Sequence, residues 1–479
     1  MTAIFETGIF QTVAATSPLV ELNNRARTVA IVGGGASGAL VAVGLMKAAA
    51  KPLNVIIIEP SAKLGRGIAY ATTCPMHLLN VPAGAMSAYP DAPDHFVNWL
   101  RENVDAALTP ESFVERRLYG DYIESELRQA EIATTPRVRL RHVLDWVKAA
   151  RCNEHGAVLE LAGGARIAAH SVVLALGNPP PSNPIRGAGA DTVRTAWPAP
   201  RGYQVQKQDS VLLIGSGLTA VDAALSLNYF GHRGKIHMVS RHGLWPLIHP
   251  EYGAPLRSFT NVDDLTRSVR RLTAALRFDA ASVTDDGGSW CSIVDGLRAC
   301  TSEIWKRLDS AERRRFLSHL QPYWDIHRHR MAPEVARRFA AMCCEGRVVL
   351  HAGRIVETAQ APNGLMRVIV KARGRRETLM LEVARIINCT GPQTDYRAIA
   401  QPLIHDLFAQ GVAAQDELKL GLLTGPDGAL LGEDGLASRT FFTLGPPRKG
   451  TLWETTAMPE IRLQASVLAR RLLGDGDDC

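Results

Sequence analysis

The chain has 479 residues, which is too long for one compact domain and enough for two or three of ordinary size. Hydrophobic residues make up 46% and charged residues 21%, a composition that excludes a disordered chain. The formal net charge of +7 comes from 54 basic and 47 acidic residues. This excess is moderate for the length and does not require a nucleic-acid partner.

The first 26 residues contain acids and lack a basic stretch followed by an apolar core, so we expect an N-terminal extension at 1–26 and no secretory signal. The eight cysteines are scattered and form no CxxC motif. This usage indicates reduced thiols in a cytoplasmic protein, and it argues against flavin enzymes that pass electrons through two adjacent thiols.

Residues 29–46 form an uncharged run of 18 residues, close to the length that crosses a bilayer. Three consecutive glycines, Gly33–Gly35, interrupt this run directly after the β-branched stretch 28–32. A membrane helix would be weakest at this point, because glycine has a poor helix propensity. The run therefore predicts a strand, a turn and a helix, and no membrane partner is expected.

The spacing Gly33-x-Gly35-x-x-Gly38 fits the dinucleotide fingerprint, with Ala36 and Ser37 between the second and third glycines. In this motif one glycine turns the chain, one admits the pyrophosphate and one lets the helix approach the strand. The helix N-terminus then faces the phosphates. A glycine-rich turn with a purely structural role stays open as the alternative for this motif taken alone.

A second strand is predicted at 54–58, where a continuous β-branched run ends in Glu59. Glu59 lies 21 residues past Gly38, the place from which a carboxylate binds the ribose diol of a dinucleotide. This context strengthens the assignment of the first site.

The pattern recurs after residues 211–214, with two glycines and an alanine in the three fingerprint positions. The residues assigned to this second site are Gly215, Ser216, Gly217, Leu218 and Thr219, and the alanine is Ala220. Arg241 follows the next predicted strand, 21 residues past Ala220, at the same offset as Glu59 in the first unit.

Because a carboxylate repels a 2′-phosphate and a guanidinium binds one, we expect an unphosphorylated adenosine in the first site and NADPH in the second. The alternative is that Arg241 is an exposed residue at a strand end and that the second cofactor is NADH.

Two dinucleotide sites in one chain predict a flavoprotein in which nicotinamide reduces a bound FAD, with FAD in the first site. The segments 171–177 and 385–391 each read as a strand followed by glycine, which is typical of chains that cross between two such domains. The fold class is therefore α/β, with two Rossmann-like domains of which the first is interrupted by the second. The predicted ranges are 27–205 and 384–479 for the FAD domain and 206–383 for the NADP domain with a helical insertion.

Several further segments resemble a known family. They are Gly65–Tyr70, His77–Ala83, Met86–Ser87, Asp94–Leu100, Tyr323–Arg330, Gly450–Glu454 and Ala457–Arg462. On these segments the chain resembles bacterial FAD/NAD(P)-binding proteins related to class B flavin monooxygenases and to lysine and ornithine N-hydroxylases. The resemblance covers nearly everything after residue 27.

The resemblance implies further cofactor contacts, which are Gly65, Arg66, Gly67, Leu79, Asn80, Thr390, Gly391, Trp453 and Thr455. Glycines at 65 and 67 allow close backbone approach, and the segment 77–82 suits a wall beside the flavin ring. A helix beginning near Pro459 would present its positive end to the flavin, although a plain docking helix explains the same pattern.

The catalytic candidates are His77, Asn80 and Arg330, which we expect to shape the flavin and substrate pocket. The segment 323–330 combines aromatic, histidine and arginine residues and is the best candidate for an anion or substrate contact. A cationic, solvated start of a helix is the alternative. No metal site is expected, because adjacent cysteines at 343 and 344 do not match zinc-ligand spacing.

The leading hypothesis is an FAD-dependent, NADPH-using monooxygenase of the cytoplasm, acting on a small nucleophilic substrate such as an amine nitrogen, with O2 as co-substrate. Oxygen transfer would proceed through a flavin C4a-(hydro)peroxide. Two alternatives stay open, namely an NADPH-dependent reductase or dehydrogenase without oxygen insertion, and a flavin-binding redox sensor. We expect no nucleic-acid partner, and the sequence does not determine the oligomeric state.

Overall fold

The first sheet forms because a series of short, β-branched runs is buried on both faces and pairs almost entirely in parallel. A computed structural model describes residues 12–13, 26–134, 136–185, 192–197, 201–250 and 268–474. In spatial order the strands of this sheet are β1 (Thr12–Val13), β4 (Val138–Val143), β3 (Leu53–Ile58), β2 (Arg27–Val32), β8 (Ser171–Leu174), β17 (Ala437–Thr443) and β16 (Ala429–Leu431). The predicted extension at 1–26 lies outside the described residues except for 12–13 and 26.

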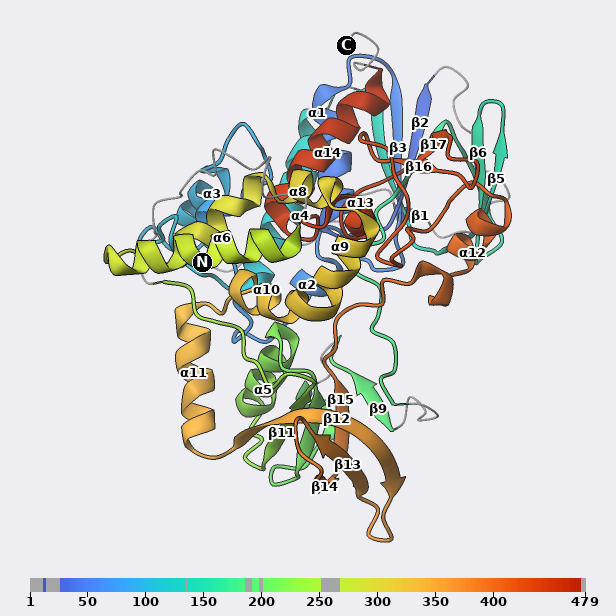
Figure 1. Cartoon of the computed structure of the whole chain (residues 1–479). Coiled ribbons are helices and arrows are strands. Elements are labelled where there is room, and N and C mark those ends of the chain that lie inside the picture. Colours follow the sequence, from blue (N-terminus) through green and yellow to red (C-terminus); the bar gives the residue numbers. More distant parts are fainter. Residues whose placement is uncertain are drawn as a thin grey trace, which may run out of the picture.

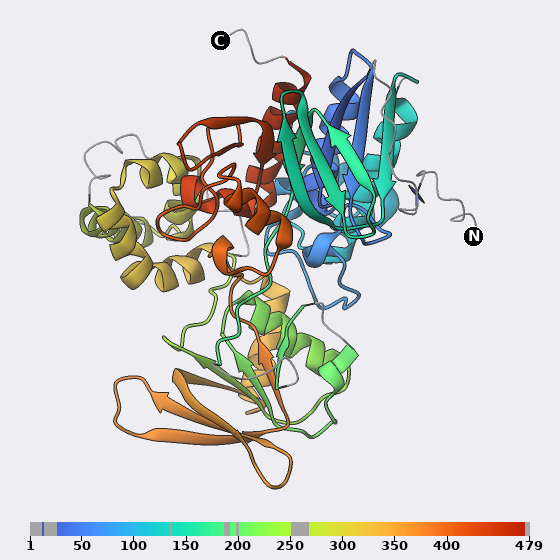
Figure 2. The same cartoon turned by 90° about the vertical axis from the view of Figure 1, so that its right-hand side faces the viewer.

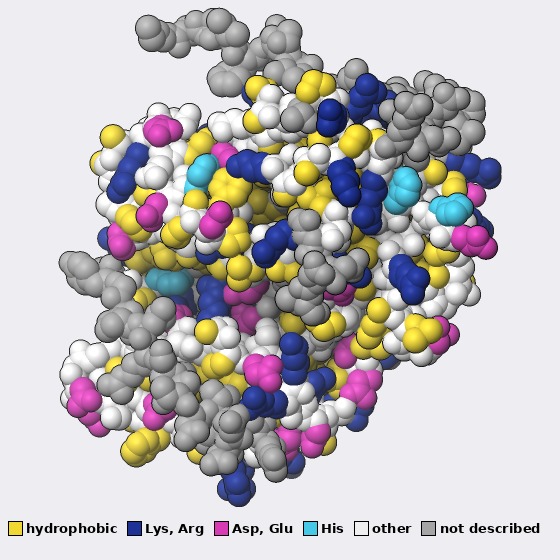
Figure 3. Space-filling view, turned by 90° about the horizontal axis from the view of Figure 1, so that it is seen from above, with side chains coloured by type: hydrophobic (Ala, Val, Ile, Leu, Met, Phe, Trp, Pro, Cys, Tyr) yellow, Lys and Arg dark blue, Asp and Glu magenta, His cyan; other side chains and the backbone are white. Residues whose placement is uncertain are grey.

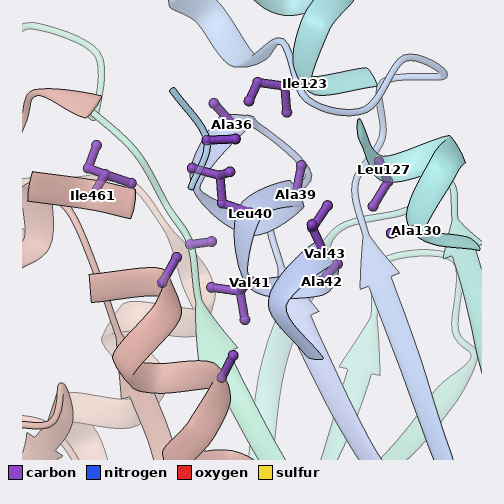
Figure 4. Close-up of a cluster of buried hydrophobic side chains, with 14 of the residues drawn as sticks. Ala36, Ala39, Leu40, Val41, Ala42, Val43, Ile123, Leu127, Ala130 and Ile461 are labelled. Carbon is purple, nitrogen blue, oxygen red and sulfur yellow. The ribbon is translucent and has the colours of Figure 1, made fainter. Parts of the chain in front are cut away.

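Three helices cover one face of this sheet, namely α1 (Ala36–Ala48), α4 (Arg116–Ala133) and α14 (Met458–Leu473). Figure 4 shows the side chains of α1 between Ile123 and Leu127 of α4 on one side and Ile461 of α14 on the other. Nine of the thirteen residues of α1 are buried, which explains why most of its sequence is apolar. The run at 29–46 is thus a strand, a turn and a helix, as predicted, and no helix among the described residues is long and apolar enough to cross a membrane.

The opposite face of the first sheet is covered by a three-stranded antiparallel sheet and one helix. These elements are β5 (Val147–Asn153), β6 (Gly156–Leu161), β7 (Arg166–Ala169) and α12 (Pro402–Ala409). Shorter helices in this first lobe are α2 (Gly67–Tyr70), α3 (His95–Asn103) and α13 (Lys449–Leu452), with further single turns at Ala83–Ala85, Tyr396–Ala398 and Pro446–Arg448.

The second sheet lies in a separate lobe, below the first in Figure 1 and Figure 2. Its order is β14 (Thr378–Val383), β13 (Met366–Ala372), β12 (Val348–Gln360), β11 (Ile236–Ser240), β10 (Val211–Ile214), β15 (Arg385–Asn388) and β9 (Val193–Thr195). The strands from β12 to β9 are parallel, and β13 and β14 continue the sheet as an antiparallel hairpin. Helices α5 (Leu218–Tyr229) and α11 (Pro333–Cys344) pack on the buried side, and a single turn lies at Arg201–Gln204.

This sheet takes strands from both sides of the predicted range 206–383. β9 precedes the range and β15 follows it, and β15 pairs with the free edge of β10 along four residues. A central strand needs a partner on each edge to satisfy its backbone groups, and only tertiary pairing reveals that the run at 385–388 supplies one.

A helical segment is inserted between β11 and β12, and it packs on the first lobe. Its elements are α6 (Val269–Asp285), α7 (Cys291–Gly296), α8 (Thr301–Arg307), α9 (Ser310–Arg315) and α10 (Gln321–Arg328), with short turns at Leu297–Ala299 and Phe316–Leu320. Trp305 of α8 stacks on Trp453 of the first lobe with ring centroids 4.7 Å apart, and its indole N–H donates to the Gly450 carbonyl at 2.8 Å. The insertion therefore shares a hydrophobic core with the segment before α14.

Candidate functional site

Both glycine-rich loops lie at the junction of the two lobes, which follows from the direction of the strands. β8 leaves the first sheet at Leu174 and the chain passes to the second lobe, whereas β15 leaves the second sheet at Asn388 and the chain returns (Figure 1). β2 is parallel to β8, and β10 is parallel to β15, so the loop after each strand faces the other lobe. Ligands of open α/β sheets bind outside these carboxyl ends.

The first loop has no room for a side chain at two of its three glycines. A Cβ on Gly33 would lie 2.4 Å from the Ala175 carbonyl oxygen, and a Cβ on Gly38 would lie 2.0 Å from the Gly33 carbonyl oxygen. These contacts show the close approach of helix to strand that the fingerprint predicts. Ala36 and Ser37 form the first turn of α1, which begins after Gly35.

The N-terminus of α1 fits an anion. No side chain caps this helix end, and no acidic residue lies in its first turn, so its positive end is open to a phosphate. The glycine-rich loop before this helix and the missing side-chain cap are the observations that fit the pyrophosphate of FAD.

Glu59 lies beside this loop, where its carboxylate accepts hydrogen bonds from the backbone N–H groups of Gly34 at 2.9 Å and Ser61 at 3.0 Å. A carboxylate has further lone pairs, so the ribose contact predicted for Glu59 is compatible with these bonds. Gly65 donates its N–H to the Gly34 carbonyl at 2.8 Å, so the segment 65–67 lies against the same loop.

Arg66 is held away from the loop by acids on α4. Its guanidinium contacts Asp121 at 2.6 Å and Glu124 at 2.7 Å. The cofactor contact of Arg66 stays a prediction. The backbone of Arg66, between Gly65 and Gly67, is better placed for this contact than the side chain, which is paired with the two acids.

The second loop also begins an uncapped helix. Gly215 has φ of +114° and approaches Cys389, Gly217 precedes α5 without a side-chain cap, and a Cβ on Gly217 would meet nothing within 4 Å. The Ser216 hydroxyl donates to the Leu244 carbonyl at 2.6 Å, which ties the loop to the segment after β11. Leu218 and Thr219 form the first turn of α5.

Thr390 lies beside this second loop, and Gly391 follows it in the chain. A Cβ on Gly215 would be 3.4 Å from the backbone nitrogen of Thr390. The Thr390 hydroxyl donates to the Asn388 side chain at 2.6 Å, and Asn388 in turn donates to the Ser182 carbonyl at 2.9 Å, so the two crossing segments are bound together.

Arg241 is exposed at the end of β11, and two more arginines lie around it. Burial lowers the pKa of His242, and the positive charges of three neighbouring arginines, Arg373, Arg241 and Arg354, lower it further. Because an arginine N–H only donates, the Arg373 guanidinium donates to Nδ1 of a neutral His242 at 2.5 Å. This end of β11 is therefore cationic, as a site for a 2′-phosphate requires.

The sequence reasoning missed Arg354 and Arg373 as candidates. Arg354 comes from β12 and Arg373 from the turn between β13 and β14, more than 100 residues beyond Arg241. The basic run at 373–376 is the signal in the sequence that could have indicated Arg373.

His77 lies in the contact between the two lobes, which does not fit the expectation that it shapes the flavin and substrate site. Its ring is fully buried, and it contacts Ser226 and Asp222 of α5 through Nε2 and Thr72 through Nδ1. Burial lowers the pKa of His77, so the ring is neutral. A side chain with both ring nitrogens engaged by the protein has no free group for a substrate.

Asn80 and Arg330 both lie close to His249. His249 donates from Nε2 to the Asn80 carbonyl at 2.9 Å. Burial lowers the pKa of His249 to about 4, with the charge of Arg330 as the next cause. Leu79, next to Asn80, is buried in the core of the first lobe.

Arg330 is a buried cation with unused hydrogen-bond donors. Its side chain is 3% exposed, and one terminal nitrogen donates to both oxygens of Asp295 at 2.6 and 2.7 Å. Its Nε and Nη1 atoms have no hydrogen-bond partner. Orphaned donors on a buried guanidinium are costly, so they point to a group that the protein itself does not supply.

The C-terminal segment returns to the first loop. Gly445 follows β17, and a Cβ on it would be 3.6 Å from the Ser37 hydroxyl. The Thr455 hydroxyl is buried and donates to the Gly445 carbonyl at 2.9 Å. Trp453 has φ of +60°, which is rare for a residue with a side chain, and its ring packs on the helical insertion.

A surface hollow of about 510 Å³ lies at the other edge of the first sheet and is lined by Arg27, His155, His170 and Arg439, among others. Arg27 and Ser171 begin β2 and β8, so this is the amino-terminal edge of the sheet. In the view from above (Figure 3), basic and acidic side chains are interspersed on the face shown. We do not place the cofactor site there, because such sheets bind ligands at their carboxyl ends.

Comparisons with known proteins agree with this geometry. Residues 30–179 match the model of the FAD-NAD(P)-binding family, a range that contains the first glycine-rich loop and Glu59. No curated protein matches the chain.

Several solved structures share the fold along nearly the whole chain. The L-lysine 6-monooxygenase of Pseudomonas syringae is 16% identical with a TM-score of 0.63, and the reduced ornithine hydroxylase of Pseudomonas aeruginosa is 15% identical with a TM-score of 0.63; each alignment covers 94% of this chain and 99% of the other. The ornithine N-hydroxylase of Kutzneria sp. 744, with reduced FAD, NADP+ and L-ornithine, is 15% identical with a TM-score of 0.62, covering 93% and 99%. These likenesses confirm the predicted fold class and the predicted resemblance to the lysine and ornithine N-hydroxylases.

Proposed function

We propose that this chain is an FAD-dependent, NADPH-using monooxygenase that hydroxylates a small nucleophilic substrate, with an amine nitrogen as the leading candidate. The observation that carries the proposal is the pair of uncapped helix N-termini, one in each lobe, that face the same junction. One is paired with the carboxylate of Glu59 and the other with the guanidinium of Arg241. The fold is shared with lysine and ornithine hydroxylases at TM-scores of 0.62 to 0.63, and this likeness is the reason that we place oxygen transfer before simple reduction.

FAD, when bound at the first loop, supplies the hydride acceptor and the oxygen-activating group. The chain contributes binding and orientation: the N–H groups at the start of α1 hold the pyrophosphate, and Glu59 accepts from the ribose hydroxyls. The start of α5 and the arginines around Arg241 hold NADPH. The helical insertion packs on the first lobe, where it shares a hydrophobic core with Trp453.

Asn80 and Arg330 are the proposed substrate contacts. The two unpartnered nitrogens of Arg330 support this role, since they are positioned donors without an internal acceptor. His77 is withdrawn from the catalytic set, because its ring nitrogens are bonded within the protein.

The experiment begins with the purified protein and its visible spectrum, followed by NADPH consumption in the presence of oxygen and a panel of small amines. We expect bound flavin, faster NADPH consumption with one class of amine, and hydroxylated product in equal amount to NADPH. NADPH consumption that yields only hydrogen peroxide with every amine favours the reductase alternative. A colourless protein that does not bind added FAD contradicts the proposal.

A further inference from the structure

One contact between the two lobes is made by a loop of the first lobe that reaches the dinucleotide helix α5 of the second. The segment before and after His77 extends from the first lobe down to α5 (Figures 1 and 2). Three apolar side chains of the first lobe, Met76, Leu78 and Phe113, pack against the core of the second lobe. The packing is not directional by itself, so polar groups must fix the angle between the lobes.

His77 supplies one set of directional bonds. Its Nε2 lies 2.7 Å from the Ser226 hydroxyl and 3.1 Å from the Asp222 carbonyl, and its Nδ1 lies 2.7 Å from the Thr72 hydroxyl. The Asp222 carbonyl only accepts, so Nε2 carries the ring hydrogen and the Thr72 hydroxyl donates to Nδ1. Thr72 and His77 belong to the first lobe and the other two residues to α5, and the rings of His77 and Trp197 also meet edge to face.

An ion pair supplies the second set. Arg116 begins α4 in the first lobe, and its guanidinium contacts the Asp222 carboxylate on α5 at 2.8 Å. The same guanidinium donates from Nε to the Leu78 carbonyl at 3.0 Å. The Asp222 and Arg116 side chains are 7% and 15% exposed, so neither charge has much contact with water.

These partners are satisfied in one orientation of the lobes only. A rotation of α5 away from the first lobe breaks the bonds of His77, Ser226 and Asp222 together and separates the Asp222 carboxylate from Arg116. An unpaired buried charge is strongly unfavourable, whereas a matched pair adds little stability over an apolar pair. The cluster is therefore better suited to specify an orientation than to raise stability.

We propose that His77, Arg116, Asp222 and Ser226 form an interdomain clamp that holds α5, and with it the loop Gly215–Leu218, at a fixed angle to the first lobe. The clamp rests on the proposed function in one respect, since its purpose is to align the nicotinamide bound at α5 with the flavin bound at α1. Its four residues are positioning residues, because they act through their bonds across the contact between the lobes. Alignment matters because hydride transfer is sensitive to displacements of about 1 Å.

The test uses Arg116→Met, Asp222→Asn and the double variant, with Arg151→Met as the control. Arg151 makes an exposed ion pair with Asp406 inside the first lobe, so its loss leaves the lobe angle unchanged. Small-angle scattering of the protein without added nucleotide is the first readout. We expect a larger radius of gyration for both single variants and for the double variant, and no change for the control.

The second readout is the anaerobic rate of flavin reduction by NADPH, with the affinity for NADP+ measured separately. We expect a decrease of about 10-fold or more in the rate in all three clamp variants, with NADP+ affinity within about twofold of the wild type. The double variant has no unpaired charge, so its thermal stability should exceed that of either single variant while its reduction rate stays low. A reduction rate that recovers together with stability would show a merely structural ion pair and overturn the proposal.

If the charge variants do not fold, Ser226→Ala is the variant that tests the clamp. It removes only the hydroxyl that contacts His77. We expect faster amide hydrogen exchange in the segment 72–80 and in α5 than in the wild type, and unchanged exchange in α12. Unchanged scattering and exchange in every folded variant would also overturn the clamp. If the protein binds no FAD, the proposed function fails. The scattering and exchange measurements still test whether the clamp fixes the angle between the lobes, because they need no cofactor.

Discussion

Replacement of Arg241 by alanine tests the assignment of NADPH to the second site. Arg241 is exposed at the end of β11, and it lies close enough to His242 to share that electrostatic environment with Arg354 and Arg373. A charge-assisted hydrogen bond to a phosphate is worth about 1.5–3 kcal/mol, and exposure to solvent favours the lower end. Loss of Arg241 should therefore weaken NADPH binding by about 10- to 100-fold, since about 1.4 kcal/mol corresponds to tenfold.

The remaining two arginines set a limit on this loss. They keep the strand end cationic, so the variant should still prefer NADPH over NADH, although by a smaller factor. NADH carries no 2′-phosphate, and its affinity should change by less than about twofold. The preference of the wild type should also fall as salt is raised, because the three side chains are exposed.

The assay is calorimetric titration of wild type and variant with NADP+ and NAD+ at two salt concentrations. Arg166→Ala is the matched control, because Arg166 is an exposed arginine of β7 in the first lobe. Equal losses for both nucleotides would refute the assignment of Arg241 as a phosphate contact. A wild type that binds NAD+ as tightly as NADP+ would refute the assignment of the whole cluster.

Three further predictions follow from contacts of single residues. Gly38→Ala should lower the free energy of unfolding, measured by urea titration, by about 3 kcal/mol or more, because its Cβ would meet the backbone at 2.0 Å. Its counterpart Gly217→Ala should fold normally, because its Cβ enters open space, and it should bind NADP+ less well. The pKa of His249 is about 4 in the folded protein and near 6.5 when unfolded, so its neutral ring contributes stability that is present above about pH 6.5 and is lost as the pH falls toward 4. This loss amounts to as much as about 3 kcal/mol, and His249→Gln should flatten the profile of unfolding free energy against pH; an unchanged slope would contradict the burial of a neutral ring. Trp305→Phe should destabilise the protein by about 1–3 kcal/mol, because the Gly450 carbonyl loses its donor, and calorimetric unfolding that matches the wild type would contradict this.

The sequence was sufficient for features that depend on a few neighbouring residues. The strand, turn and helix around Gly33–Gly38 could be predicted because Gly33 and Gly38 are required by local geometry, where an added Cβ meets backbone of the same unit or of the residue after the adjacent strand. In the second loop the argument holds for Gly215 alone, because a Cβ on Gly217 meets nothing within 4 Å. The equal offsets of Glu59 from Gly38 and of Arg241 from Ala220 are also read directly from the sequence. The fold class followed from two such units in one chain.

What the sequence by itself determined is thus the two dinucleotide folds and the sign of the charge at the end of each second strand. The tertiary structure decided which distant residues complete these sites. It places Arg354 and Arg373 near Arg241, and it places His249 and Asp295 beside Arg330. It also places His77 in the contact between the lobes, where the sequence predicted a residue of the flavin pocket. A local motif fixes backbone geometry over a few residues, but a side chain's partner depends on which strands and helices pack together. That pairing is a property of the whole fold, and no spacing along the chain records it.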